Sequence, residues 1–267
     1  MKQFFSLLFV AFVLVACSSP EKKAEALLVE VRSAMSECRY DDARMLVDSL
    51  RSAYPTAVEA RREALRLENE FELADAKNCL VLASEKLEKE TARLDSIKKH
   101  FVLEKDAKYQ AVGYYVIPEQ VGSKMHKTAL RAQVNEEGQM VLVSILRDKR
   151  LNHKRIRVSL PTGEMAETPQ CFSFLTHSVI GYEEEASFRL GDDGGVIAFI
   201  SDNSGTMTVA CIGDKGQHTF QLSPSDKFAV RHCYLLAKRF EAVKILTEEK
   251  EKLSLKVRFY EKKMAVL

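Results

Sequence analysis

Apolar side chains recur every seven residues along a stretch without proline or glycine, from about residue 57 to 105. This series consists of Leu73, Leu80, Leu87, Leu94 and Phe101. A second series follows three residues after each of the first four members, at Ala76, Ala83, Glu90 and Ile97. Two series spaced by three and four residues form one stripe along a helix, as in a coiled coil. The pattern predicts a helix of about 49 residues, roughly 74 Å long.

A second helix of similar pattern is predicted at the end of the chain. Ser223 can cap its first amides, and Pro224 suits its first turn. If the intervening segment joins neighbouring ends of the two helices, Glu90 lies beside Arg239, and this ion pair would fix the register. We expect residues 56–107 and 223–264 to form an antiparallel coiled coil. The same heptads would permit a dimer, so the oligomeric state stays open.

Between the helices, residues 108–222 are predicted to form β structure. Glycine-containing turns such as Asn203-Ser204-Gly205 separate runs of β-branched and aromatic residues. The expected strands lie near 109–116, 128–134, 139–147, 153–160, 186–190, 196–201, 206–212 and 217–222. Regular turn spacing favours an antiparallel barrel or sandwich. The predicted fold class is α+β, with this domain inserted between the two long helices.

An N-terminal helical hairpin is expected over residues 24–55, with Asp41 or Asp42 as the cap of its second helix. Its pattern resembles one tetratricopeptide unit in Leu27, Tyr40, Ala43, Val47, Leu50 and Pro55. It departs from that family at Val31, where a small residue is usual. Such units need neighbours to bury their faces, so we expect the pair to dock on the long helices. A generic helical hairpin would show the same pattern.

The first 16 residues have the pattern of a secretory signal, with Lys2 followed by a short apolar run. Leu14-Val15-Ala16-Cys17 resembles the lipobox of bacterial lipoproteins. The resemblance implies that Cys17 carries a lipid anchor, that residues 17–23 form a tether, and that Ser18 favours the outer membrane, facing the periplasm. An ordinary cleaved signal followed by a free cysteine is the alternative.

Composition narrows the range of partners and chemistry. Forty basic and 38 acidic residues give a net charge of +2, which argues against a nucleic-acid partner.

The cysteines other than Cys17 are expected to be buried thiols, with a Cys171–Cys211 disulfide as the alternative. His100, His232 and Cys233 could approach one another, but two partly exposed histidines are favoured over a metal site. The Gly191–Gly195 segment is interpreted as a tight turn, and no cofactor is expected.

The densest basic stretch contains Arg147, Lys149, Arg150, Lys154, Arg155 and Arg157. Such a stretch could contact an anionic partner of the envelope, such as lipid phosphates or an acidic protein. Alternatively, these charges pair with the acidic run 183–185 on a neighbouring strand.

No catalytic motif is recognisable in the sequence. We therefore expect a non-catalytic, lipid-anchored binding or scaffolding protein with an envelope protein as its partner. A periplasmic holding chaperone is the alternative, because the order helix–β–helix resembles prefoldin subunits. An enzyme is the least favoured class.

Lipidation can be tested by metabolic labelling with palmitate. We expect the full chain to incorporate the label and a Cys17→Ala variant to incorporate none, because the thiol is the attachment point. Label that persists on the variant would contradict the assignment of Cys17.

Overall fold

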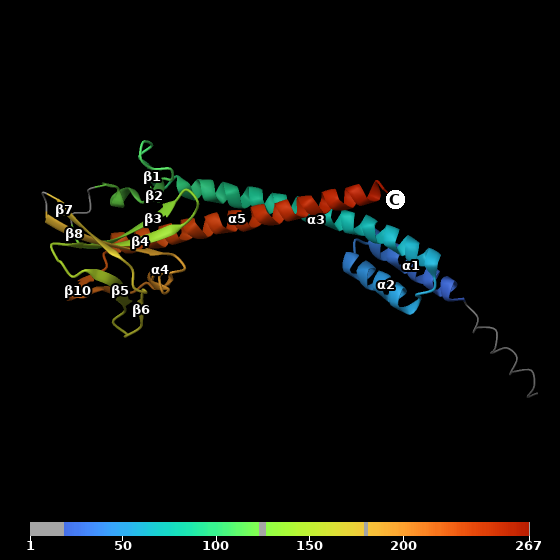
Figure 1. Ribbon diagram of the computed structural model, residues 1–267, viewed down its shortest axis with the longest axis horizontal. Coiled ribbons are helices and arrows are strands. Elements are labelled where there is room, and N and C mark those ends of the chain that lie inside the picture. Colours follow the sequence, from blue (N-terminus) through green and yellow to red (C-terminus); the bar gives the residue numbers. More distant parts are fainter. Residues whose placement is uncertain (1–18, 123–126, 179–180, 267) are drawn as a thin grey trace, which may run out of the picture. The chain divides into compact units, whose positions relative to one another are not determined.

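The computed structural model describes residues 19–122, 127–178 and 181–266 and contains both helices and two antiparallel sheets (Figure 1). This confirms the α+β class. The chain divides into two compact units, and the division falls within both long helices. The helical unit contains the described residues up to 86 and from 246 onward. The β unit contains residues 87–245.

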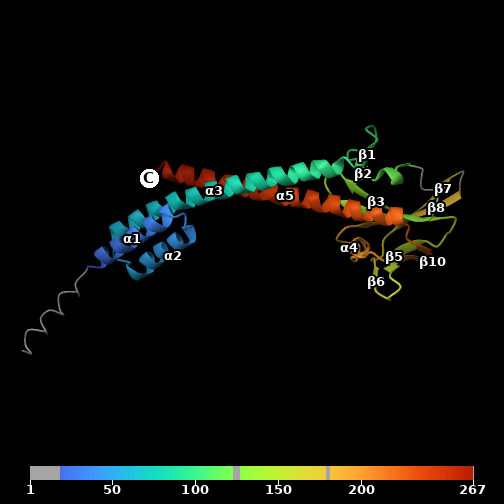
Figure 2. The ribbon, with the colours of Figure 1, turned by 180° about the vertical axis from the view of Figure 1, so that it is seen from behind.

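In the helical unit, α1 (Pro20–Ser36) and α2 (Tyr40–Ala53) pack beside the first half of α3 (Val58–Lys98) (Figure 2). Their shared core is rich in alanine, which lets the helix backbones approach closely. Its fully or nearly fully buried members include Ala24, Ala43, Ala60, Ala64 and Phe71. The last turns of α5 (Pro224–Met264) belong to the same unit, where Lys256 Nζ lies 2.7 Å from Glu72 Oε2.

Two expectations for the N-terminal helices were wrong. The helix α1 begins at Pro20, inside the expected tether, because Ser19 Oγ accepts a hydrogen bond from the Lys22 amide at 3.4 Å. Neither Asp41 nor Asp42 caps α2, which starts without a side-chain cap. Both carboxylates instead form ion pairs with arginines, Asp41 with Arg44 and Asp42 with Arg39.

The β unit contains one six-stranded and one four-stranded sheet, and all neighbouring strands are antiparallel. The larger sheet has the order β1 (Val102–Glu104), β2 (Tyr114–Val116), β3 (Ala129–Asn135), β4 (Met140–Arg147), β8 (Gly181–Arg189), β7 (Ser173–Ser178). The smaller has the order β10 (Gly216–Gln221), β9 (Thr208–Gly213), β5 (His153–Ser159), β6 (Met165–Glu167). Over the described strands neither sheet closes into a barrel.

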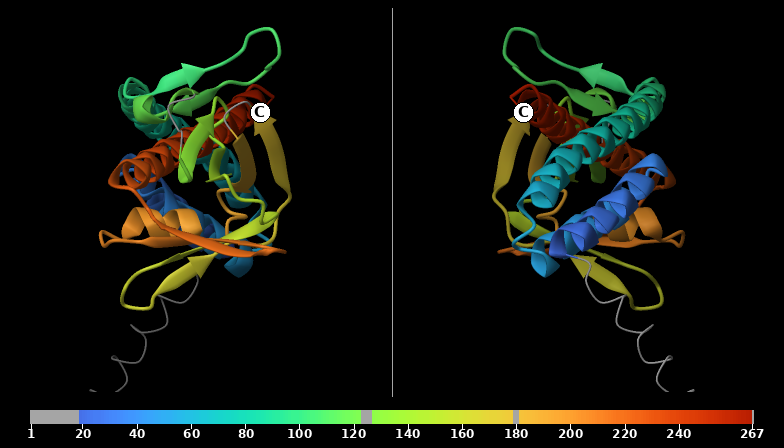
Figure 3. Two further views of the ribbon diagram at one scale, coloured as in Figure 1. Left: turned by 90° about the vertical axis from the view of Figure 1, so that its left-hand side faces the viewer. Right: turned by 90° about the vertical axis from the view of Figure 1, so that its right-hand side faces the viewer.

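The strand expected at 196–201 is instead the helix α4 (Val196–Asp202), which packs beside β5 and β6 (Figure 3). Gly195 before it has a φ of 80°, a conformation that glycine adopts easily. The buried Asp193 accepts a hydrogen bond from the Ile197 amide at 2.6 Å. This carboxylate satisfies a free helical amide and so favours a helix in a segment whose composition suits a strand.

Helical side chains complete the core of the β unit. Leu94 of α3 and five residues of α5 lie in one buried cluster with the strands. The contribution of α5 is Ala229, Val230, Cys233, Leu236 and Ala237. The expected cap of α5 is confirmed, since Ser223 Oγ accepts from the Asp226 amide at 3.1 Å. The expected ion pair is also confirmed, with Arg239 Nη1 3.0 Å from Glu90 Oε2.

Asn69 on α3 is fully buried, and neither its amide nitrogen nor its oxygen has a partner among the described residues. A buried polar group without a hydrogen bond costs about 1–3 kcal/mol. We therefore predict that Asn69→Leu, which keeps the branched shape and the number of side-chain heavy atoms, raises the free energy of unfolding by about 1–3 kcal/mol in urea titrations. The exposed Asn78 of the same helix provides the control, and Asn78→Leu should change stability by less than about 0.5 kcal/mol. A destabilised Asn69→Leu variant would contradict this interpretation.

Candidate protein-binding edge of the β unit

Strand β7 forms an edge of the six-stranded sheet. Among the described strands it pairs with β8 alone, from Ser173 opposite Ala186 to Ser178 opposite Gly181. In an antiparallel edge strand, every second residue directs its N–H and C=O away from the sheet. The segment from Pro169 to Ser178 contains no charged residue. The edge therefore lacks the lysines with which many sheets block the addition of another strand.

Large apolar side chains are exposed along this edge. Phe172 is 87% exposed, Phe174 70% and Leu175 55%. Successive residues of a strand point to opposite faces, so Phe174 and Leu175 show that neither face is covered here. Isolated exposed apolar residues are ordinary, but three within four positions on an open edge are typical of an interaction surface.

A hollow of about 620 Å³ lies where β8 extends beyond the start of β7. It is lined by Pro169, Gln170, Cys171, Ser187, Phe188, Arg189, Gly191, Asp192 and Gly194. Burial raises the pKa of the Cys171 thiol, which makes this cysteine a poor nucleophile at neutral pH. An added strand could place one side chain in such a hollow, while backbone hydrogen bonds supply affinity.

The basic stretch is largely neutralised by neighbouring strands. Arg155 Nη1 and Arg157 Nε each lie 2.6 Å from a carboxylate oxygen of Glu167, and Lys154 Nζ lies 2.8 Å from Asp214 Oδ2. Two further contacts join Arg147 to Glu183 and place the Arg150 guanidinium 3.4 Å from the centre of the Tyr182 ring. Only Lys149 has no acidic or aromatic partner among the described residues. The alternative of pairing with the acidic run is confirmed for Arg147.

The other candidate residues are not brought together. Cys17 lies outside the described residues. His232 stacks on Phe228, and its Nδ1 lies 2.8 Å from the Phe228 carbonyl oxygen, so it belongs to the surface of α5. Over the described residues, no three His, Cys, Asp or Glu side chains meet as a metal site would require. The alternative of a Cys171–Cys211 disulfide is wrong, because all five described cysteines are free thiols. The expected burial holds for Cys211 and Cys233, whereas Cys38 is exposed.

The Gly191–Gly195 turn is followed by a helix, contrary to our expectation of two flanking strands. One amide of the turn and one of the following helix already have an anionic partner. The Asp193 carboxylate accepts hydrogen bonds from Gly191 at 3.1 Å and Ile197 at 2.6 Å. A phosphate would have to displace this buried carboxylate.

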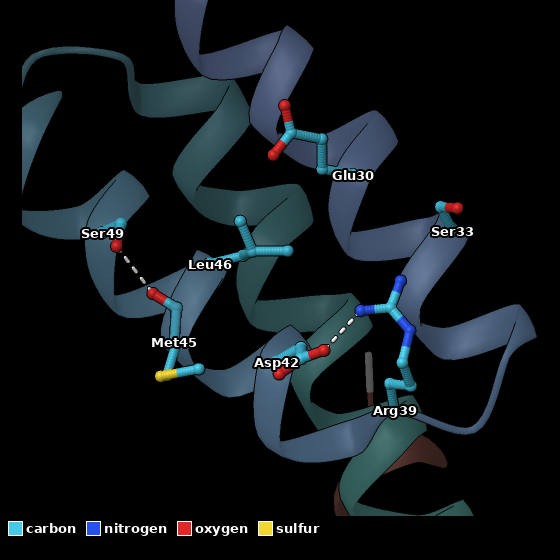
Figure 4. A pocket seen from close by; sticks show the side chains of 7 residues that line it. All are labelled: Glu30, Ser33, Arg39, Asp42, Met45, Leu46 and Ser49. Atoms are coloured by element: carbon cyan, nitrogen blue, oxygen red, sulfur yellow. Dashed lines mark hydrogen bonds and ion pairs between the residues drawn. The ribbon is translucent and has the colours of Figure 1, made fainter.

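The helical unit has a groove of about 400 Å³ between α1 and α2 (Figure 4). It is lined by Glu30, Ser33, Arg39, Asp42, Met45, Leu46 and Ser49. Arg39 bonds to Asp42 across its lower end and to Glu37 at 2.9 Å, so its main cation is neutralised. Because its lining is of mixed polarity and its arginine is already paired, this groove is a weaker candidate than the β7 edge.

Sequence reasoning missed the β7 edge. The alternation of aromatic and polar residues from Phe172 to Leu175 is short and lies next to Pro169, which obscures it. Residues 169–178 contain no Asp, Glu, Lys or Arg, but residues 203–213 and 216–225 lack them too, so the absence of charge does not single out this edge.

Comparisons with known proteins give no assignment. No protein-family model, no curated protein and no solved structure matches this chain. Over the described residues, no helix has the length and apolar character needed to cross a membrane.

A buried contact connects the two sheets next to this edge. Glu184 of β8 accepts hydrogen bonds from the Asn152 amide at 3.0 Å and from the His153 amide at 3.1 Å, and its Oε2 lies 3.1 Å from His153 Nδ1. Burial alone would raise the pKa of Glu184, but these contacts together outweigh it and hold the pKa below its ordinary value.

A lowered folded-state pKa means that Glu184 stabilises the fold above its unfolded pKa of about 4.3 and that this stabilisation is lost as pH falls through the folded value. Glu184→Gln should therefore lower the free energy of unfolding at pH 7 by about 1.5–3 kcal/mol. The difference from the parent chain should shrink between pH 5 and pH 3.5, as measured by denaturant titration. Glu119→Gln, at an exposed position, should have no such effect. A deficit that does not depend on pH would rule out the charged carboxylate as its cause.

Proposed function

We propose that this protein is a non-catalytic, lipid-anchored protein of the bacterial envelope that binds an extended segment of an envelope protein. The observation that carries the proposal is the open, uncharged edge of β7 with Phe172, Phe174 and Leu175 exposed. The lipobox-like Leu14–Cys17 sequence supports the anchor and a location at the outer membrane facing the periplasm.

The proposal assigns a supporting role to the long helices as an antiparallel coiled coil. Two contacts support it, each within one unit: Glu90–Arg239 in the β unit and Glu72–Lys256 in the helical unit. The buried alanine-rich contacts of α1 and α2 support the resemblance of residues 24–55 to a tetratricopeptide unit. In this role the helices α3 and α5 pack on the core of the β unit and leave the β7 edge uncovered.

A periplasmic holding chaperone is the second candidate. The same exposed apolar side chains favour it, because unfolded chains bind to uncovered apolar surface. The two functions differ in selectivity. A binding module uses one edge for one partner, whereas a holding chaperone contacts many chains through many surfaces.

Site-specific photocrosslinking in cells distinguishes them. A photoreactive residue at Phe172 should give one discrete adduct, while the same residue at Gln217, on the exposed edge strand β10, should not. Leu175→Lys should reduce the adduct about tenfold, equivalent to roughly 1.4 kcal/mol, because lysine on an edge strand opposes pairing. The β unit should keep its stability, since Leu175 is exposed.

Many adducts of similar yield from both positions would contradict the binding module. That result, together with suppression of client aggregation by the purified protein, would favour the chaperone. An adduct whose yield is unchanged by Leu175→Lys would remove β7 from the interface.

A further inference from the structure

The last turns of α5 present an apolar face that no described element covers. Leu255 is 63% exposed and Phe259 is 59% exposed. They lie four residues apart, hence on the same side of the helix. Val266, two residues past the end of α5, is also exposed. The opposite side contains the buried Val257. Lys256, beside the face, is already paired with Glu72 at 2.7 Å.

Four cations border this face, and none has an acidic partner among the described residues. They are Lys252, Arg258, Lys262 and Lys263, all exposed. Lys263 Nζ lies 5.7 Å from the centre of the Phe259 ring, so cation and aromatic ring form one surface. The neighbouring acid Glu261 is already paired with Lys77 at 2.9 Å. Two exposed acids, Glu248 and Glu251, lie on the same side one to two turns before Leu255, and the four cations outnumber them. The face therefore combines aromatic and aliphatic side chains with unneutralised positive charge.

We infer that this face, formed by Leu255, Phe259, Val266 and the four cations, lies on an anionic lipid surface. A helical face that combines exposed phenylalanine and leucine with lysine and arginine suits the membrane interface, where apolar side chains enter the acyl boundary and cations meet phosphates. A second copy is a poor occupant, because it would bring four like charges against four.

The inference rests on the proposed lipid anchor for its setting. The helical unit contains both this face and Ser19, two residues after Cys17. An acyl anchor would therefore hold the same unit near the bilayer, where a weak second attachment becomes effective. The face itself can be tested without the lipid.

The test uses the unacylated chain from Ser18 onward, which includes every described helix and strand. The chain contains no tryptophan, so Phe259→Trp introduces a single fluorescent reporter. We expect its emission to shift to the blue with vesicles of phosphatidylglycerol and phosphatidylcholine. It should remain unshifted with phosphatidylcholine alone, and the shift should weaken as salt rises.

Vesicle sedimentation then tests whether binding depends on the cations of this face or only on the total charge of the protein. The variant Lys252→Gln/Arg258→Gln/Lys262→Gln/Lys263→Gln should bind anionic vesicles at least tenfold more weakly. A matched variant with Lys86, Lys89, Lys99 and Lys244, all exposed, changed to glutamine loses the same charge elsewhere and should bind as the parent does. Leu255→Ser/Phe259→Ser should weaken binding in a salt-independent manner.

Three outcomes would overturn the inference: no binding of the parent to anionic vesicles, equal loss in both lysine variants, or a blue shift that grows with protein concentration without vesicles. The last would identify a second copy as the occupant. Palmitate labelling remains a separate measurement. Vesicle binding without palmitate labelling would contradict only the proposed anchor. Palmitate labelling without vesicle binding would contradict only the proposed lipid-binding face.

Discussion

The hydrophobic core of the β unit depends on helical side chains. Two open antiparallel sheets cannot enclose every apolar face that they present, and α5 supplies the missing cover with residues such as Val230 and Leu236. Gln120 connects strand β3 to the first turn of α5 by hydrogen bonds. Its amide donates to the Leu130 carbonyl at 2.9 Å and to Asp226 Oδ1 at 3.1 Å, while its oxygen accepts from the Ala132 amide at 3.0 Å. The start of α5 is therefore part of the β core, and its first turns must fold with the strands.

Polar groups between the helices differ in how well they are satisfied. Burial would raise the pKa of Glu72, but Arg44 and Lys256 together hold it below its ordinary value, so the carboxylate stays charged. An ion pair of this kind contributes more to register than to stability, because apolar pairs could fill the space at similar free energy. Asn69 has no such compensation among the described residues. If the role of Asn69 is to specify how the helices pack, the stability gained on replacing it with leucine measures what that specificity costs.

The long helices and most hairpins could be predicted because their signals repeat over many residues. The seven-residue series leading to Leu94 and the cap at Ser223 are of this kind. The expected extent of the first helix was wrong, because α3 ends at Lys98 and β1 lies within the segment that was expected to stay helical to about residue 105. The failures are short segments whose structure depends on one distant or local contact. Residues 196–202 are rich in strand-forming side chains, yet the carboxylate of Asp193 favours a helix. The β7 strand spans six residues, and its candidate role depends on the absence of a neighbour, which no pattern in its own sequence encodes.

The density of charge in a sequence is a poor guide to the field outside the protein. Strands in a sheet lie about 5 Å apart, so the cations of β5 meet the acids that neighbouring segments place beside them, as Arg157 meets Glu167. On a helix surface that packs against no neighbouring element, no other segment places acidic side chains beside the cations. Lys252, Arg258 and Lys262 are sparser along the chain than the cations of residues 147–157, but they lack acidic partners among the described residues. The unpaired cations near the end of α5 are therefore better placed to meet an anionic surface than the paired cations of β5.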